Sequence, residues 1–252
     1  MTSFAAGEPP WVERLGNLRN VVRQEVIARQ IAPLAMRGTT VLDVGCGQGT
    51  QALRLASFGC RVTGIDPSSE LLDLCAEAAI AQRLDVELLH GGIEDLDQLC
   101  GGRTFELVCC HGVMMYLDDW TQAVGDLAER LRTDGRMSIT FRNGHALAMR
   151  PGLRGDWAAA LSAFDSTAYV NELGLTARAC RADEIEEALA AAGLRPLSWH
   201  GVRVLTDAVA ADVIPPDPET LELLLQAEER AGSREPYKWM ASQLHVIAEV
   251  AA

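Results

Sequence analysis

Short apolar segments alternate with amphipathic segments between residues 40 and 142, and this alternation constrains the fold more than any other feature. The apolar segments predict strands at Thr40–Val44, Arg61–Ile65, Val86–His90, Phe105–Cys110 and Arg136–Phe141. The intervening segments predict helices at Thr50–Phe58, Ser68–Gln82 and Asp119–Arg132. Strands separated by helices of this length favour a parallel sheet with helices on both faces. Ligands of such sheets bind at the carboxyl ends of the strands.

The chain after residue 142 has a different pattern. We expect residues 143–182 to form an insertion, or lid, because Gly, Pro and Trp interrupt any long period there. The elements expected beyond it are helices at Asp183–Ala192 and Glu219–Arg230 and strands at Trp199–Leu205 and Leu244–Val250. The predicted fold is α/β: one domain over 1–252, with an N-terminal helical cap at 1–36. Its Rossmann-like sheet has seven strands, mostly parallel with an antiparallel last strand.

Three glycines, Gly45, Gly47 and Gly49, lie between the first expected strand and the helix that follows it. Their spacing is not GxGxxG, the fingerprint of dinucleotide sites. Acids follow the strands instead: Asp43 precedes the turn, and Asp66 ends the second strand. A carboxylate at the position of Asp66 can accept hydrogen bonds from ribose hydroxyls.

Acids also follow the third strand, where Glu94 and Asp95 can meet an adenine amino group. These segments contain no lysine, so a pyrophosphate is poorly matched to the pocket. A cationic ligand with an amino group and a ribose is well matched.

Composition limits the partners and the compartment. The 252-residue chain carries a formal net charge of −13, which disfavours broad electrostatic binding to nucleic acid or anionic membranes. Its seven cysteines include no CxxC pair, so we expect no disulfide framework, no metal site and a reducing cytoplasm. The N-terminus does not resemble a signal peptide, and the apolar runs are shorter than a membrane span.

Three motifs, VLDVGCGQGT, VTGIDPS and GGIEDL, occur in this order and resemble those of class I S-adenosylmethionine-dependent methyltransferases. The alternatives are an NAD-binding Rossmann enzyme and a non-catalytic module that keeps the turn. Five further segments resemble the bacterial tRNA carboxymethoxyuridine methyltransferase family, which methylates a carboxylate: VVRQEVIARQI, CHGVMMYLDD, ITFRNGHAL, HGVRVLTDAV and REPYKWMASQLHV. This resemblance covers residues 16 to 248.

The resemblance implies S-adenosylmethionine as cofactor. Arg23 would bind its methionine carboxylate, and His111 would lie near the sulfonium. The backbone of Gly45 and Cys46 would line the methionine moiety. The complete set of expected cofactor residues is Arg23, Asp43, Gly45, Cys46, Gly47, Gly49, Asp66, Pro67, Ile93, Glu94, Asp95 and His111.

The lid departs from that family, in which the corresponding loop is strongly basic. Here it reads LRGDWAAALSAFDSTAYVNELGLTARACRADE and is nearly neutral. Phosphate contacts dominate RNA affinity, so we expect a small-molecule acceptor. A tRNA acceptor, bound through Arg150, Arg154, Arg178 and Arg181, is the alternative. The oligomeric state stays open.

The residues expected to bind the methyl acceptor are mainly polar residues that follow the later strands. The expected catalytic residues are His111, Arg142, His145 and Arg203, and the expected substrate residues are Tyr116, Asn143, Arg203 and Tyr237, with Trp120 as an aromatic wall. Arg203 is either a surface strand residue or a planar clamp for a carboxylate. A carboxylate acceptor needs no general base at neutral pH, whereas a hydroxyl or amine would need His111 or His145.

Overall fold

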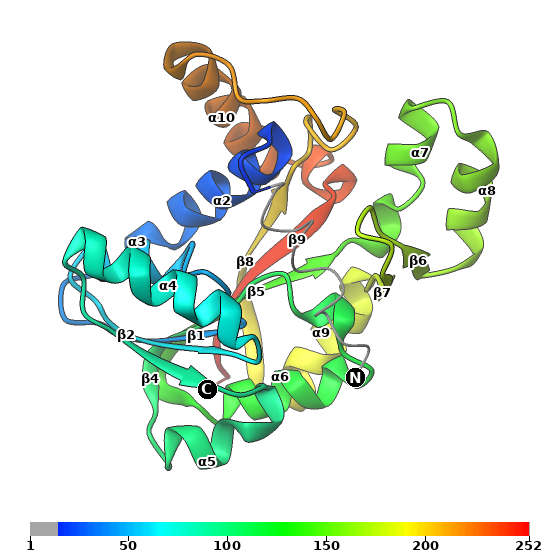
Figure 1. Cartoon of the computed structure of the whole chain (residues 1–252). Helices are drawn as coiled ribbons and strands as arrows, with labels where there is room; N and C mark the ends of the chain where they lie inside the picture. Colours follow the sequence, from blue (N-terminus) through cyan, green and yellow to red (C-terminus); the bar gives the residue numbers. More distant parts are fainter. Residues whose placement is uncertain (1–14, 252) are drawn as a thin grey trace.

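A seven-stranded sheet crosses the centre of the molecule (Figure 1). The structure is a computed structural model and describes residues 15–251. The strands are β1 (Thr40–Val44), β2 (Arg61–Asp66), β3 (Val86–His90), β4 (Phe105–Cys110), β5 (Leu131–Arg142), β8 (Leu194–Val202) and β9 (Gln243–Val250). Their order is β3-β2-β1-β4-β5-β9-β8, and β9 pairs antiparallel with both of its neighbours. The predicted mostly parallel sheet with an antiparallel last strand is confirmed.

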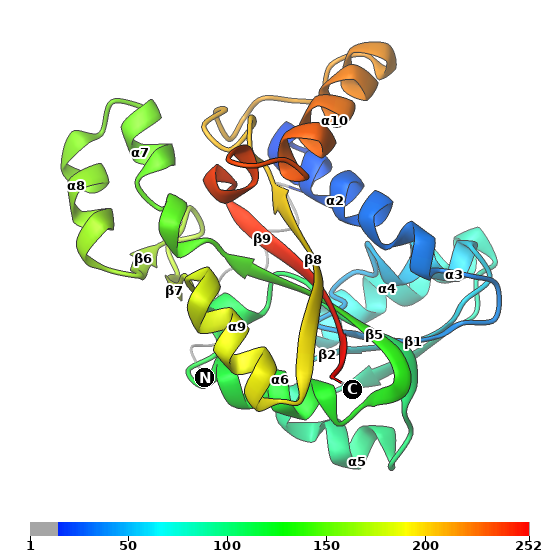
Figure 2. The same ribbon diagram turned by 180° about the vertical axis from the view of Figure 1, so that it is seen from behind.

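Helices cover both faces of the sheet, as Figures 1 and 2 show from opposite sides. One face carries α2 (Leu18–Ile31), α3 (Ala52–Ser57) and α4 (Ser69–Gln82), and the other carries α5 (Leu96–Cys100), α6 (Trp120–Ala128) and α9 (Ala182–Ala191). Alternate residues of β1 reach the two layers: Val41 packs with the first group, whereas Leu42 and Val44 pack with the second. This period of two is that of a strand buried on both faces.

Several predicted boundaries were wrong, and the strand expected at Arg136–Phe141 already begins at Leu131. The helix expected to reach Arg132 ends at Ala128, because Leu131 already pairs with Phe105 of β4. The strand expected at Trp199–Leu205 begins at Leu194 and ends at Val202. Arg203 ends it with a φ of 59°, a left-handed conformation that does not continue a strand.

Residues 143–182 form an excursion that leaves and rejoins the sheet at one place. It contains α7 (Met149–Leu153), α8 (Trp157–Asp165) and a hairpin of β6 (Ala168–Val170) and β7 (Thr176–Arg178). At its base, Gly144 N donates to Cys180 O at 2.8 Å, and Cys180 N donates to Arg142 O at 2.9 Å. The hairpin and α7 lie beyond the carboxyl end of β5 (Figure 1), the end at which ligands of parallel sheets bind.

The N-terminal cap is described from residue 15, and residues 1–14 of the predicted cap lie outside the described residues. Its helix α2 packs on α10 (Pro218–Gly232) through a small apolar cluster that includes Val22, Val26, Val202 and Leu225. Among residues 15–251, no helix is long and apolar enough to cross a membrane.

Candidate active site

A cavity of about 450 Å³ opens at the carboxyl ends of β1, β2, β4 and β5 and is also lined by α2 and the β6–β7 hairpin. Predicted site residues on its wall are Arg23, Asp43, Gly45, Cys46, Gly47, Asp66, Pro67, Ile93, Glu94, His111, Tyr116, Arg142 and Arg203. Gly49, Asp95, Asn143, His145 and Tyr237 do not line it. The cavity is within the size range of small-molecule and cofactor sites.

The glycine turn brings bare backbone to the cavity. Gly45 has a φ of 73°, and a Cβ there would lie 2.2 Å from Cγ2 of Val113. Gly49 has a φ of 86°, and its Cβ would lie 2.4 Å from Sγ of Cys75. Both positions therefore require glycine, because a Cβ at Gly45 would clash with Val113 and a Cβ at Gly49 with Cys75 of α4.

Backbone N–H groups fix the carboxylate of Asp66. Its Oδ2 accepts from Gly47 N at 2.7 Å, and its Oδ1 accepts from Ser68 N at 2.9 Å. Ser68 is also the N-cap of α4, with its Oγ accepting from Leu71 N. A carboxylate oxygen accepts more than one hydrogen bond, so Asp66 on the cavity wall can accept further hydrogen bonds from hydroxyl groups.

Asp43 lies beneath the turn and is 3% exposed. Burial, and secondarily the charge of Asp66, raises the pKa of Asp43 to about 7. A cation bound in the cavity would favour the ionised form of Asp43. Asp95 lies outside the cavity wall because its Oδ2 accepts from Gly92 N at 2.9 Å and closes the first turn after β3. Ile93 and Glu94 of that turn face the cavity instead.

A chain of hydrogen bonds holds the ring of His111. Its Nε2 lies 2.9 Å from Ser138 Oγ, which lies 2.7 Å from His245 Nε2, and His245 Nδ1 lies 2.5 Å from Gln30 Oε1. The amide oxygen can only accept, so His245 donates from Nδ1 and accepts at Nε2 from the Ser138 hydroxyl. Ser138 then accepts from His111 Nε2, which leaves the lone pair on Nδ1 of His111.

That Nδ1 atom has no hydrogen-bond partner among the described residues. Burial, together with the nearby charge of Arg23, lowers the pKa of His111 to about 3. Burial also lowers the pKa of Arg23 to about 10, which leaves the guanidinium charged at neutral pH. His111 is thus a neutral ring, and a weak base, beside a fixed cation.

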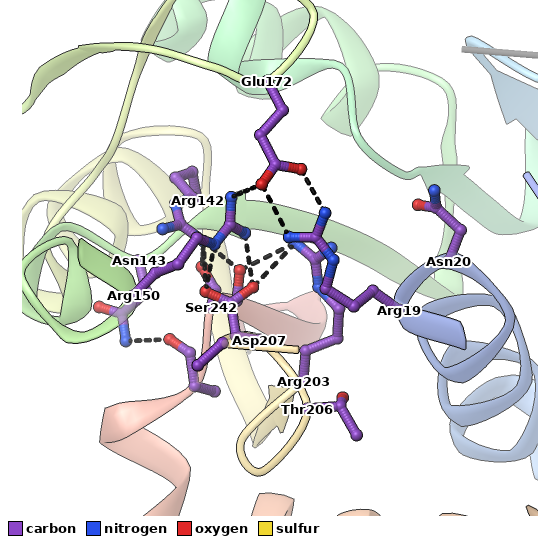
Figure 3. Close-up of polar contacts among 12 residues, drawn as sticks. Arg19, Asn20, Arg142, Asn143, Arg150, Glu172, Arg203, Thr206, Asp207 and Ser242 are labelled. Carbon is purple, nitrogen blue, oxygen red and sulfur yellow. Dashed lines mark hydrogen bonds and ion pairs between the residues drawn. The ribbon is translucent and has the colours of Figure 1, made fainter. Parts of the chain in front are cut away.

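An arginine cluster occupies the other half of the cavity (Figure 3). Asp207 is its centre: Arg150 contacts both carboxylate oxygens, at 2.9 and 2.6 Å, and Arg142 and Arg203 lie 3.7 and 3.5 Å away. Arg142 and Arg203 also donate to Ser242. The surrounding arginines hold the pKa of Asp207 far below its usual range in spite of burial.

Glu228 of α10 sets the loop that carries Arg203 into the cavity. This carboxylate is fully buried and accepts from the N–H groups of Val204, Leu205 and Thr206 and from the Thr206 hydroxyl. The side chain of Arg203 is 11% exposed. The alternative that Arg203 is a surface strand residue was therefore wrong, and the structure brings it beside Arg142.

Other acceptor-side expectations were not met. Asn143 is fully buried and donates to the carbonyls of Trp239 and Ala241. His145 and Tyr237 are exposed, and Trp120 packs in the core with its ring 5.5 Å from that of Phe141. Tyr116 does line the cavity, and its hydroxyl accepts from Asn171 at 3.0 Å.

Three residues of the site were not predicted, Arg19, Glu172 and Asp207, and Arg150 was expected only as an RNA contact. Arg19 could have been found, because it precedes Arg23 by one helical turn and so shares its helix face. Glu172 and Asp207 lie on loops without local periodicity. Nothing in their own segments indicates that they meet the arginines.

The strand order and the acid-lined glycine turn define the class of Rossmann-like methyltransferases. Residues 41–135 match the family described as "Methyltransferase domain". The chain is 26% identical over 244 residues to tRNA 5-carboxymethoxyuridine methyltransferase from Escherichia coli strain K12, covering 92% of this chain and 88% of that protein. It is 31% identical to a ubiquinone biosynthesis O-methyltransferase from Coxiella burnetii over half of each chain.

Solved structures agree on the fold. Magnesium protoporphyrin IX methyltransferase from Synechocystis PCC 6803, with bound SAH, superposes with a TM-score of 0.64 at 16% identity, covering 98% of this chain and 95% of that one. The chain is an S-adenosylmethionine-dependent methyltransferase. The expected class of enzyme and its cofactor are confirmed, and the NAD-binding and non-catalytic alternatives are not supported.

Proposed function

We propose that this enzyme transfers a methyl group to a carboxylate oxygen of a small acidic acceptor, a modified nucleoside included. The observation that carries the proposal is the pair Arg142 and Arg203, which lie in the cavity with buried Nε atoms that lack a hydrogen-bond partner among the described residues. A planar guanidinium with open donors matches a carboxylate.

The cavity wall fits the cofactor. We propose that Arg23 binds its methionine carboxylate and Asp66 its ribose hydroxyls, with Asp43 near the cationic groups. The turn beneath it consists of Gly45, Cys46, Gly47 and Gly49, and its backbone is bare because added Cβ atoms at Gly45 and Gly49 would clash with Val113 and Cys75. The remaining proposed cofactor residues are Pro67, Ile93, Glu94 and His111, all on the cavity wall.

When bound, the cofactor supplies a sulfonium methyl group, which an acceptor oxygen attacks in line. A carboxylate is ionised at neutral pH and needs no base. A hydroxyl acceptor would require one, and His111 with a pKa of about 3 is too weak to serve efficiently at neutral pH. The protein's task is then to orient the carboxylate, with Arg142 and Arg203, and to exclude water.

A tRNA acceptor is a second candidate, because the Escherichia coli relative with 92% coverage of this chain is a tRNA methyltransferase by name. Two of the arginines considered for RNA, Arg150 and Arg154, are already held by Asp207, Glu172 and backbone carbonyls. Arg178 and Arg181 remain exposed. RNA binding that weakens steeply with salt would support this candidate, and no binding at low salt would exclude it.

The experiment for the main proposal measures S-adenosylhomocysteine formation with a panel of carboxylic acids, alcohols and amines. We expect turnover with carboxylates and its loss in Arg203→Ala. Unchanged turnover of every acceptor in that variant would refute the clamp. The described cysteines are all buried free thiols, which supports the proposed cytoplasmic location.

A further inference from the structure

The acceptor half of the cavity holds more positive than negative charge. Four guanidinium groups, those of Arg19, Arg142, Arg150 and Arg203, line it. The carboxylates that pair with them among the described residues are Asp207 and Glu172. Buried charges are normally paired, because leaving one unpaired in a poorly solvated site is costly. Two positive charges are therefore left for a ligand.

Guanidinium N–H groups without hydrogen-bond partners also indicate that an anionic ligand binds in this half of the cavity. The Nε atoms of Arg19, Arg142 and Arg203 are buried and lack a hydrogen-bond partner among residues 15–251. Arg19 and Arg142 are only 3% and 5% exposed. Leaving a buried donor without a hydrogen-bond partner is costly. A single acceptor carboxylate bound at Arg142 and Arg203 would still leave the buried Nε of Arg19 without a hydrogen-bond partner among the described residues.

Glu172 enters this cluster from the lid rather than from the sheet. It lies in the β6–β7 turn, whose backbone is held by Asn171 Oδ1 accepting from Leu173 N and Leu175 N. Its carboxylate reaches both Nη atoms of Arg19 and lies 3.7 Å from Arg150 and 3.0 Å from Arg154. The Glu172 side chain is 32% exposed, whereas that of Asp207 is 11% exposed. Asp207 is a fixed member of the cluster, and Glu172 is its solvent-facing carboxylate.

We propose that Arg19 and Arg150 form a second anion subsite, in which Glu172 occupies the place of an acceptor group. The acceptor is then a dianion: a dicarboxylate, or a carboxylate that also carries a phosphate. One carboxylate binds at Arg142 and Arg203, and the other anionic group displaces Glu172 from Arg19. This inference rests on the proposed carboxylate chemistry of the first subsite.

The test uses isothermal titration calorimetry on the full chain with S-adenosylhomocysteine present. The probes are the dicarboxylates succinate to adipate, monocarboxylates of the same chain lengths, and inorganic phosphate. In Glu172→Gln we expect at least tenfold tighter binding of dicarboxylates and phosphate, with monocarboxylates unchanged. Arg19→Gln removes the preference for dianions. Glu186→Gln, an exposed change on α9, is the matched control and leaves all affinities unchanged.

The opposite effects of Glu172→Gln and Arg19→Gln separate this proposal from a purely structural latch. If Glu172 only fastens the lid to α2, both variants lower every affinity together and both lower the melting temperature. That result, or an equal change for mono- and dicarboxylates, overturns the second subsite. Which of phosphate and the dicarboxylates gains more in Glu172→Gln identifies the acceptor's second group.

Failure of the proposed function has a different signature. In that case no carboxylate is methylated, and Arg203→Gln leaves carboxylate binding unchanged, whereas phosphate binding to Glu172→Gln still reports on the second subsite.

Discussion

Replacement of Arg203 should lower the activity of the enzyme and raise its free energy of unfolding. It has a left-handed backbone, with a φ of 59°, and a buried Nε that lacks a hydrogen-bond partner among the described residues. Such a backbone costs about 1–3 kcal/mol in a non-glycine residue, and an unsatisfied donor costs a similar amount. Burial, opposed by the charge of Asp207, lowers the pKa of Arg203 to about 9. The protein therefore holds this arginine against local preference.

The perturbation is Arg203→Asn, because asparagine tolerates the left-handed region. The change removes the unsatisfied donor and one of several positive charges but loses the hydrogen bond to Ser242, worth about 1 kcal/mol. Asp207 keeps its two contacts with Arg150. We expect the free energy of unfolding without acceptor to rise by about 1 kcal/mol, or about 2–4 °C in melting temperature.

The activity of Arg203→Asn should fall. Two charge-assisted hydrogen bonds to an acceptor carboxylate, each worth about 1.5–3 kcal/mol, predict a loss of at least about 100-fold in kcat/KM. The assays are calorimetric melting and S-adenosylhomocysteine release, with Arg178→Asn on the exposed side of β7 as control. A threefold or smaller loss of kcat/KM would refute the clamp. A loss of stability above about 2 kcal/mol would assign Arg203 a structural role.

Three further predictions concern the rest of the site. Cofactor affinity should rise with pH and level off above about 7, because the neutral form of Asp43 must lose its proton to face a cation; Asp43→Asn should abolish this dependence in a binding titration. The profile of kcat against pH should lack a limb near pH 6–7 from His111, whose pKa of about 3 keeps it neutral; a limb that disappears in His111→Asn would contradict this. Glu228→Ala should lower the free energy of unfolding by about 2–4 kcal/mol in chemical denaturation, because three N–H groups and a hydroxyl lose their acceptor; a loss below 1 kcal/mol would show that this loop does not depend on it.

The cofactor half of the site was largely predictable because its signals are local. β1, β3 and β4 have the predicted bounds, since each is a short apolar run bounded by turn residues. Asp43, Gly45 and Asp66 follow from strand ends alone, and parallel strands bring their carboxyl ends to one edge. Asp95 shows where local signals fail: it follows a strand as a cofactor residue would, but its carboxylate accepts from Gly92 N in the turn after β3 and does not line the cavity.

The acceptor half was less predictable because its geometry is non-local. The direction of Arg203 depends on Glu228, 25 positions later, and on a backbone conformation that strand periodicity cannot indicate. Asn143 follows a strand as a substrate residue would, yet buried carbonyls of Trp239 and Ala241 take both of its amide hydrogens. The excursion brings Glu172 to Arg19 across the cavity, and no sequence spacing records that contact.

Alkaline release of the transferred methyl group distinguishes a carboxylate acceptor from a hydroxyl or an amine. The enzyme would be incubated with S-adenosylmethionine labelled in its methyl group and a fraction of small acidic metabolites, and the product treated with mild alkali. Esters of carboxylic acids release their methyl group as volatile methanol, whereas methyl ethers and methylamines do not. We predict that the label becomes volatile, and that Arg203→Asn abolishes its incorporation. Label that resists alkali would show a hydroxyl or amine acceptor and would contradict methyl transfer to a carboxylate.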